Sequence, residues 1–358
     1  MRNESASNRA EPPNPLAWGG LLAALAAVTF GITTPIIQRL GHNAGALPTA
    51  ALLYAGAAAV SMTGFGSKEG REAPVRRRHA GRLVVIAIVG ALFAPVCLAW
   101  GLQHTSGSGA SLLLNMEAMF TVLFAWRLYD EPIGGRVALA LAVMAAGGLC
   151  LVLGEQREEG VGWGAVAVVL ATFGWALDNA LTRPLADLNP TQVVRWKAGL
   201  GATFGLIVSL VFNQTFPKAL AMLGLLACGA TGYGLSLRLY LLAQRRIGAG
   251  RTGSIFALAP FVGAACAWTM GERSVGVMTL LAAGLFGLGV SLHLTERHRH
   301  RHIHEPVEHE HAHRHDDGHH DHRHVPPVET EHSHPHRHDD RTHDHPHAPD
   351  AHHHHRHA

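Results

Sequence analysis

The feature that most constrains this chain is a series of apolar runs, each about 20 residues long, that fills residues 16–294. A helix of that length crosses a hydrocarbon core of roughly 30 Å. Short polar links separate ten such runs, so the expected fold is all-α and membrane-embedded, with ten transmembrane helices. The runs are 16–40, 47–64, 83–103, 110–128, 136–153, 162–182, 192–212, 219–242, 251–270 and 274–294.

The second half of the chain repeats the first. Residues 248–272 read GAGRTGSIFALAPFVGAACAWTMGE, and residues 107–131 read GSGASLLLNMEAMFTVLFAWRLYDE. A shift of 141 residues aligns Gly107 with Gly248 and Glu131 with Glu272. Because each repeat holds five helices, an odd number, the two repeats must have opposite orientations in the membrane. Such inverted repeats are typical of secondary transporters, which bind their substrate near mid-membrane.

Composition divides the chain into four parts. These are a polar N-terminal segment (1–15), two five-helix repeats (16–154 and 162–294) and a tail (295–358) that holds 24 of the 28 histidines. Lys and Arg number fourteen in or beside the links that face the N-terminal side and four in the others, which predicts cytoplasmic termini in the cell (inner) membrane. The excess of Lys and Arg is therefore interpreted as setting the orientation of the helices in the membrane, and we expect no nucleic-acid partner.

Two stretches of the second half strongly resemble a known family. They are GYGLSLRLYLLAQRRIGAGRTGSIFALAPFVGAACAWTMGE (232–272) and WALDNALTRPLADLNPTQVVRWK (175–197). Both are similar to the EamA-like domain of the drug/metabolite transporter superfamily, and the resemblance covers residues 16–294. It implies ten helices, inverted repeats, cytoplasmic termini and solute transport, often export. The first repeat has Met119 where the second has Pro260, so we expect a proline-weakened helix only at 251–270.

Charges that break the repeat symmetry are the best functional candidates, because a charge in the membrane is costly and faces a cavity or a partner. Glu117 lies near the middle of the fourth run, opposite Leu258 in the other repeat, and Thr121 follows one turn later. Glu117 is expected to bind a proton or a cationic substrate; the alternative is a protonated carboxyl that only bonds a neighbouring helix. Glu131 and Glu272 precede the next helix in each repeat and are interpreted as scaffold.

Further candidates lie on the sixth to eighth runs. A pairing of Asp178 with Lys197 serves equally as a structural bridge or as part of an inner gate with Arg238. Trp175 and Asn179 on the sixth run complete the expected substrate and coupling set with Tyr233 on the eighth and Trp100 on the third. Trp100 and Tyr233 are expected to line the cavity; the alternative is that they are packing residues or interface anchors.

The tail alternates histidine with other residues, and imidazole is a good ligand for Zn, Ni, Cu and Co. No single tetrahedral set is defined, and the segment is too polar to form a core, so we expect a disordered tail with several exchangeable metal sites. The expected ligands are His298, His300, His302, His304, His309, His311, His313, His315, His332, His334, His336 and His338.

These observations favour a secondary transporter of the drug/metabolite type, which works by alternating access and exports a small solute. A transition-metal efflux transporter whose tail collects metal is the first alternative, and a membrane-anchored metal sensor or buffer is the second. The membrane part shows no nucleophile–base pair, so an enzyme is not expected, and no cofactor is required beyond metal at the tail.

Overall fold

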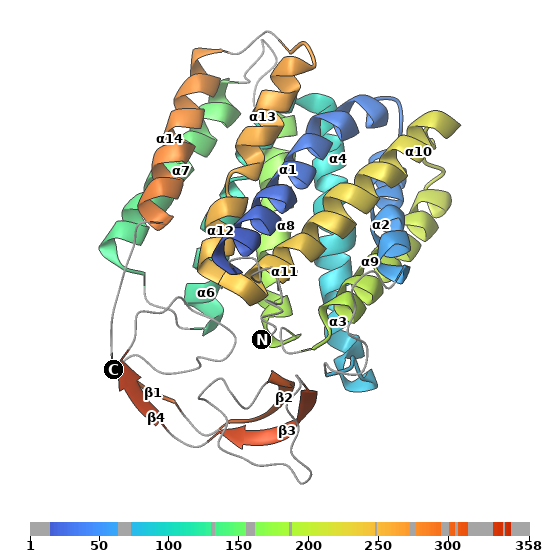
Figure 1. Ribbon diagram of the computed structural model, residues 1–358. Coiled ribbons are helices and arrows are strands. Elements are labelled where there is room, and N and C mark those ends of the chain that lie inside the picture. Colours follow the sequence, from blue (N-terminus) through green and yellow to red (C-terminus); the bar gives the residue numbers. More distant parts are fainter. Residues whose placement is uncertain are drawn as a thin grey trace, which may run out of the picture.

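The computed structural model describes residues 15–63, 73–129, 133–154, 162–185, 188–247, 249–272, 276–294, 301–304, 307–313, 332–338 and 341–344. These residues form a bundle of helices followed by four short strands (Figure 1). The elements are α1 (Pro15–Gly41), α2 (Ala46–Met62), η1 (Arg77–His79), α3 (Ala80–Ile86), η2 (Ala87–Phe93), α4 (Ala94–His104), α5 (Gly107–Leu113), α6 (Met116–Tyr129), α7 (Gly135–Gly154), α8 (Trp163–Thr182), η3 (Arg183–Leu185), α9 (Pro190–Val211), α10 (Ala219–Cys228), η4 (Gly229–Leu235), α11 (Ser236–Ile247), α12 (Ala249–Phe256), α13 (Ala259–Thr269), α14 (Val277–Leu294), β1 (Arg301–His304), β2 (Val307–His313), β3 (His332–His338) and β4 (Arg341–Asp344).

The helical integral membrane fold expected from the apolar runs is confirmed. Seven continuous helical stretches of the described residues are long and apolar enough to cross a membrane, and the apolar helices Ala46–Met62 and Val277–Leu292 are shorter. The remaining expected segment, 251–270, is divided into α12 and α13. Each of the ten predicted runs therefore corresponds to helix in the structure.

Local chemistry explains several helix ends. The Asn189 side chain accepts a hydrogen bond of 3.0 Å from the backbone N–H of Gln192, and Pro190 occupies the first turn of α9. Ser106 caps α5 in the same way, at 3.1 Å from the N–H of Gly109. Side-chain oxygens at this position satisfy N–H groups that have no partner within the helix.

The packing of the helices follows the two repeats. In the second repeat α11 and α13 both pack on α1, and in the first repeat the equivalent α4 and α6 both pack on α8. The helices α7 and α14, last in each repeat, lie side by side at one edge of the bundle (Figure 1). The π-helical segments η2 and η4 occupy equivalent places in the third and eighth spans. Such interruptions of α-helix are frequent at functional sites.

Both repeats contain a break, and of the two only the one in the second repeat lies beside a proline, as expected. The second repeat is interrupted before Pro260, which has no backbone N–H to donate. The first repeat is interrupted between α5 and α6, where the Asn115 amide donates to the Leu112 carbonyl at 3.0 Å. A short polar side chain that hydrogen-bonds the nearby backbone competes with the helical hydrogen bonds. Asn115 therefore interrupts the helix of the first repeat, as Pro260 does in the second.

Small residues bring central helices close together. A Cβ added to Gly205 of α9 would lie 3.0 Å from the Ala51 side chain of α2, and Gly201 of the same helix packs against Ala91 of η2. Residues with little or no side chain allow such close approach in membranes, where lipid supplies no hydrophobic drive between helices.

The tail departs from the expected disorder in four short segments. β1 pairs antiparallel with β4, and β2 pairs antiparallel with β3. In β1, β2 and β3 histidine alternates with other residues, and this period of two matches that of a β-strand.

Candidate functional site

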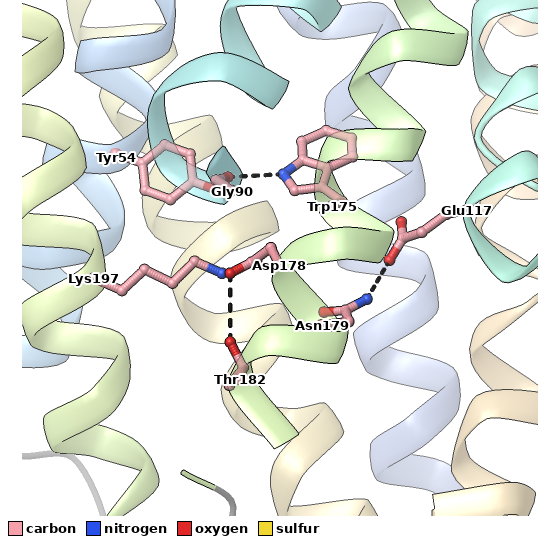
Figure 2. A network of polar contacts seen from close by, with 8 residues as sticks. All are labelled: Tyr54, Gly90, Glu117, Trp175, Asp178, Asn179, Thr182 and Lys197. Carbon is pink, nitrogen blue, oxygen red and sulfur yellow. Dashed lines mark hydrogen bonds and ion pairs between the residues drawn. The ribbon is translucent and has the colours of Figure 1, made fainter. Parts of the chain in front are cut away.

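The polar groups of the bundle interior gather around α8, the sixth span. Trp175, Asp178 and Asn179 follow one another on this helix and meet side chains from three directions (Figure 2). The helix, the first of the second repeat, packs against α4, α5, α6 and η2, which all belong to the first repeat.

One contact region surrounds the backbone carbonyl of Gly90 in η2. This oxygen accepts a hydrogen bond of 2.7 Å from the Tyr54 hydroxyl and one of 3.0 Å from the Trp175 indole (Figure 2). The N–H of Ala94 bonds Val89 instead, and the residue five places after Gly90 is Pro95, which has no N–H. The π-helix therefore leaves this carbonyl without a backbone donor, and two buried side chains satisfy it.

A second contact is the ion pair between Lys197 of α9 and Asp178 of α8. The Asp178 side chain is 2% exposed and that of Lys197 is 15% exposed. Thr182 also approaches the Asp178 carboxylate, at 3.4 Å. A Cβ on Gly90 would collide with the Asp178 side chain, so glycine at that position makes room for the carboxylate. The predicted pairing is confirmed, and its charges compensate each other.

The third contact joins Glu117 of α6 to Asn179 of α8. The Asn179 amide donates to the Glu117 carboxylate at 2.8 Å (Figure 2). Glu117 is half-buried, whereas Asn179 is exposed although it lies on the central helix. The pair thus has an accessible side, and the contact described for the Glu117 carboxylate is with an amide, whereas that of Asp178 is with the ammonium group of Lys197.

Aromatic rings form a wall beside these groups. The ring of Phe30 in α1 lies 6.4 Å from that of Trp175, 5.8 Å from Tyr233 and 5.6 Å from Phe256. Tyr233 also lies 5.6 Å, between ring centres, from Tyr54. The structure therefore brings the predicted residues Trp175 and Tyr233 together, with ring centres 6.2 Å apart.

Three predicted residues lie apart from these contacts. Trp100 is 39% exposed and stacks on His104 at 4.1 Å, ten helical residues, or about 15 Å, from Gly90. The Thr121 hydroxyl donates at 2.8 Å to the Glu117 carbonyl of its own helix, and so faces no other element through that bond. Arg238 is half-buried on α11, and its role in a gate stays a prediction.

Glu272 differs from its predicted place. Its carboxylate accepts hydrogen bonds from the backbone N–H of Ser108, at 3.1 Å, and from the Ser108 hydroxyl, at 2.5 Å. In the contacts described it therefore meets the first turn of α5, whereas the sequence interpretation associated it with the start of the following helix; the end of α13 packs on α5. Glu131 lies outside the described residues.

The predicted metal ligands fall into two groups. His298, His300 and His315 lie outside the described residues. The others belong to strands, where the Cα partners of β2 and β3 include three histidine pairs: His309 with His336, His311 with His334 and His313 with His332. Whether they bind metal stays a prediction.

With this geometry described, comparison with known proteins assigns the family. Residues 17–154 and 162–295 each match the EamA-like transporter family. The chain belongs to this family. A relative from Methanothermobacter thermautotrophicus, described as an uncharacterized transporter, is 26% identical over 224 residues. That alignment covers 61% of this chain and 65% of the relative, so it spans just under two thirds of the relative's length.

A solved crystal structure, whose title names no function, supports the fold. It shares 17% sequence identity, with a TM-score of 0.58 over 77% of this chain and 95% of that one. At this identity the likeness shows the arrangement of helices alone.

Sequence reasoning missed Tyr54, Gly90 and Phe30. One signal was present for Gly90, since Pro95 lies five residues later, but it has meaning only if the span contains a π-helical segment. Tyr54 and Phe30 lie in otherwise apolar runs, and nothing in their spacing marks them.

Proposed function

We propose that the chain is a secondary transporter of the drug/metabolite type, which moves a small solute across the cell (inner) membrane by alternating access. Its two five-helix repeats move against each other around the polar groups of α8. Export is the proposed direction, with both termini in the cytoplasm. The family match and the transporter description of the relative support this proposal.

The observation that carries the proposal is the Glu117–Asn179 pair. A carboxylate inside a membrane bundle is costly unless it has a partner or a water-filled space. Here it is hydrogen-bonded by an amide that is itself accessible, and it begins a helix that is broken near mid-membrane. Broken helices frame the binding sites of many secondary transporters. Glu117 serves as the group that takes up a proton or the cationic part of a solute.

The test uses proteoliposomes that contain a pH-sensitive dye and are exposed in turn to amino acids and divalent metal salts. An active solute should produce a proton flux with the unmodified protein and none with Glu117→Gln. Thr203→Val is the matched control, because this exposed residue lies on α9 and its hydroxyl donates to the Gly199 carbonyl of the same helix at 2.8 Å. Equal fluxes from Glu117→Gln and the unmodified protein would refute the coupling role.

A second candidate is a transition-metal efflux transporter, with the tail as a metal collector. The three facing histidine pairs of β2 and β3 favour it, because directly opposite Cα atoms in an antiparallel pair are about 4.5–5.5 Å apart.

Titration of Ni²⁺ and Zn²⁺ into the full chain and into a chain ending at residue 296 tests this candidate. Metal accumulation is then compared in cells that carry either form or neither. Loss of binding together with increased accumulation supports efflux. Loss of binding with unchanged accumulation supports a membrane-anchored sensor or buffer instead.

A further inference from the structure

At one end of the bundle, two polar contacts join the repeats. Ser108, at the start of α5 in the first repeat, donates to Glu272, just after α13 in the second. Arg39, near the end of α1, donates to the carbonyl of Met270, also just after α13. We call the end of the bundle defined by Arg39, Ser108, Met270 and Glu272 the closed end.

Small residues line the seam between α5 and α13 below these contacts. A Cβ on Gly107 would lie 3.3 Å from that of Ala267, and one on Gly263 would lie 2.8 Å from the Ser111 hydroxyl. Contacts between residues this small involve few atoms, and lipid adds no hydrophobic force that would hold the helices together. The carboxylate of Glu272, with hydrogen bonds from both a hydroxyl and an N–H, is therefore the strongest directional link across the seam.

The seam also contains an unsatisfied polar atom. The side chain of Ser111 is fully buried, and its hydroxyl has no hydrogen-bond partner among the residues that the structure describes. Leaving such a group unpaired is unfavourable, whereas water would satisfy it if α5 and α13 separated. The unpaired Ser111 hydroxyl thus favours separation of α5 and α13, and the Glu272–Ser108 contact opposes that separation.

The same two spans are arranged differently toward the other end. There α6 continues the fourth span and packs on α7 and α8, while α12 belongs to the ninth span and packs on α1, α11 and α14. Asn179 of α8 is exposed on this side of the seam, beside α6. The fourth and ninth spans therefore meet at the closed end and pack on different partners beyond it.

We propose that the Glu272–Ser108 contact is a gate lock, which holds the closed end shut in this conformation and must break before the site can open there. The inference rests on the proposed function, because a lock between repeats has a purpose only if the repeats alternate. Glu272 acts by positioning α13 against α5 and does not contact the solute.

Ser111→Cys provides a direct reporter of the seam, because this position is buried while the lock is made. Ser209→Cys is the matched control: Ser209 is equally buried, lies on α9 outside the seam and bonds Gly205 of its own helix at 2.6 Å. Each cysteine is placed in a background in which Cys97, Cys150, Cys228 and Cys266 are alanine. Labelling with a membrane-impermeant maleimide is timed on cells and on inside-out vesicles.

Glu272→Ala should raise the labelling rate of the Ser111→Cys reporter about tenfold from one side of the membrane, which corresponds to the loss of one charge-assisted hydrogen bond at a partly exposed site. Ser108→Ala, which keeps the N–H donor, should raise it less. The Ser209→Cys rate should not change. An unchanged Ser111→Cys rate in both variants, or a parallel rise at Ser209→Cys, would overturn the lock.

Because labelling needs no solute, the test separates the two proposals. If the Ser111→Cys rate responds to Glu272→Ala while no solute produces a flux, the lock stands and the transport assignment fails. If solute flux is present and labelling does not respond, transport stands and the lock is rejected. Glu272→Ala and Ser108→Ala are also purified, and a monodisperse profile of each in detergent verifies that they remain folded.

Discussion

The buried ion pair of Asp178 and Lys197 allows a quantitative prediction. Removal of one partner from a buried pair leaves an uncompensated charge and costs about 3–5 kcal/mol. Because 15% of the Lys197 side chain reaches solvent, the lower limit applies. Lys197→Met should therefore reduce the free energy of unfolding by about 3 kcal/mol, a factor of about 150 in the folding equilibrium.

The double variant Asp178→Asn with Lys197→Met removes both charges and should recover much of that loss. A coupling energy of about 2 kcal/mol between the two sites is expected, within the range for residues in direct contact. Unfolding in mixed detergent micelles, followed by circular dichroism at increasing SDS, gives the four free energies of the cycle. Lys218→Met, at an exposed lysine before α10, is the matched control and should change stability by less than about 0.5 kcal/mol.

Additive single changes, with a coupling within about 0.5 kcal/mol of zero, would refute this reasoning. That outcome would mean that water or another group satisfies Asp178 once Lys197 is shortened. A large coupling would support a structural bridge. A bridge that also gates transport would show altered solute flux in the double variant, in which the stability is largely recovered.

Two substitutions at glycine test the close packing. Gly201→Leu should reduce the yield of folded protein, measured as the monodisperse fraction after detergent extraction, because the added side chain meets Ala91. Gly199→Leu, two residues away and with open space around it, should leave that yield unchanged. Gly90→Ala should displace the Asp178 carboxylate and destabilise the protein by about 1–3 kcal/mol in the same SDS assay, as overpacking does elsewhere; unchanged stability would show that Asp178 moves freely.

The overall fold could be read from the sequence because it depends on long stretches of simple chemistry. Runs of about 20 apolar residues define spans whatever their detailed packing, and the repeat is visible at Gly107 and Gly248. The Asp178–Lys197 pair was also predictable, since two charges in neighbouring spans are stable only together.

The rest of the site depends on backbone geometry, which the sequence does not display. The role of Gly90 requires a π-helical segment that leaves its carbonyl without a donor, and the role of Tyr54 follows from that carbonyl. Glu272 was placed at the next helix along the chain, because sequence order cannot show that α13 ends against α5. In each case a contact distant in sequence decided the place of the side chain.

The break in each repeat also changes how the residues of the two repeats are aligned. Alignment by the shared glycines places Glu117 opposite Leu258, but counting from the break gives another register. Glu117 is the second residue of α6, and Pro260 is the second residue of α13, so the carboxylate of one repeat stands where the other has proline. Asn115 interrupts the first helix without proline, which leaves the second position of α6 free to carry a charge. The asymmetry of the repeats is thus concentrated at the break: the second repeat uses this position to interrupt its helix, and the first uses it to present Glu117 to Asn179.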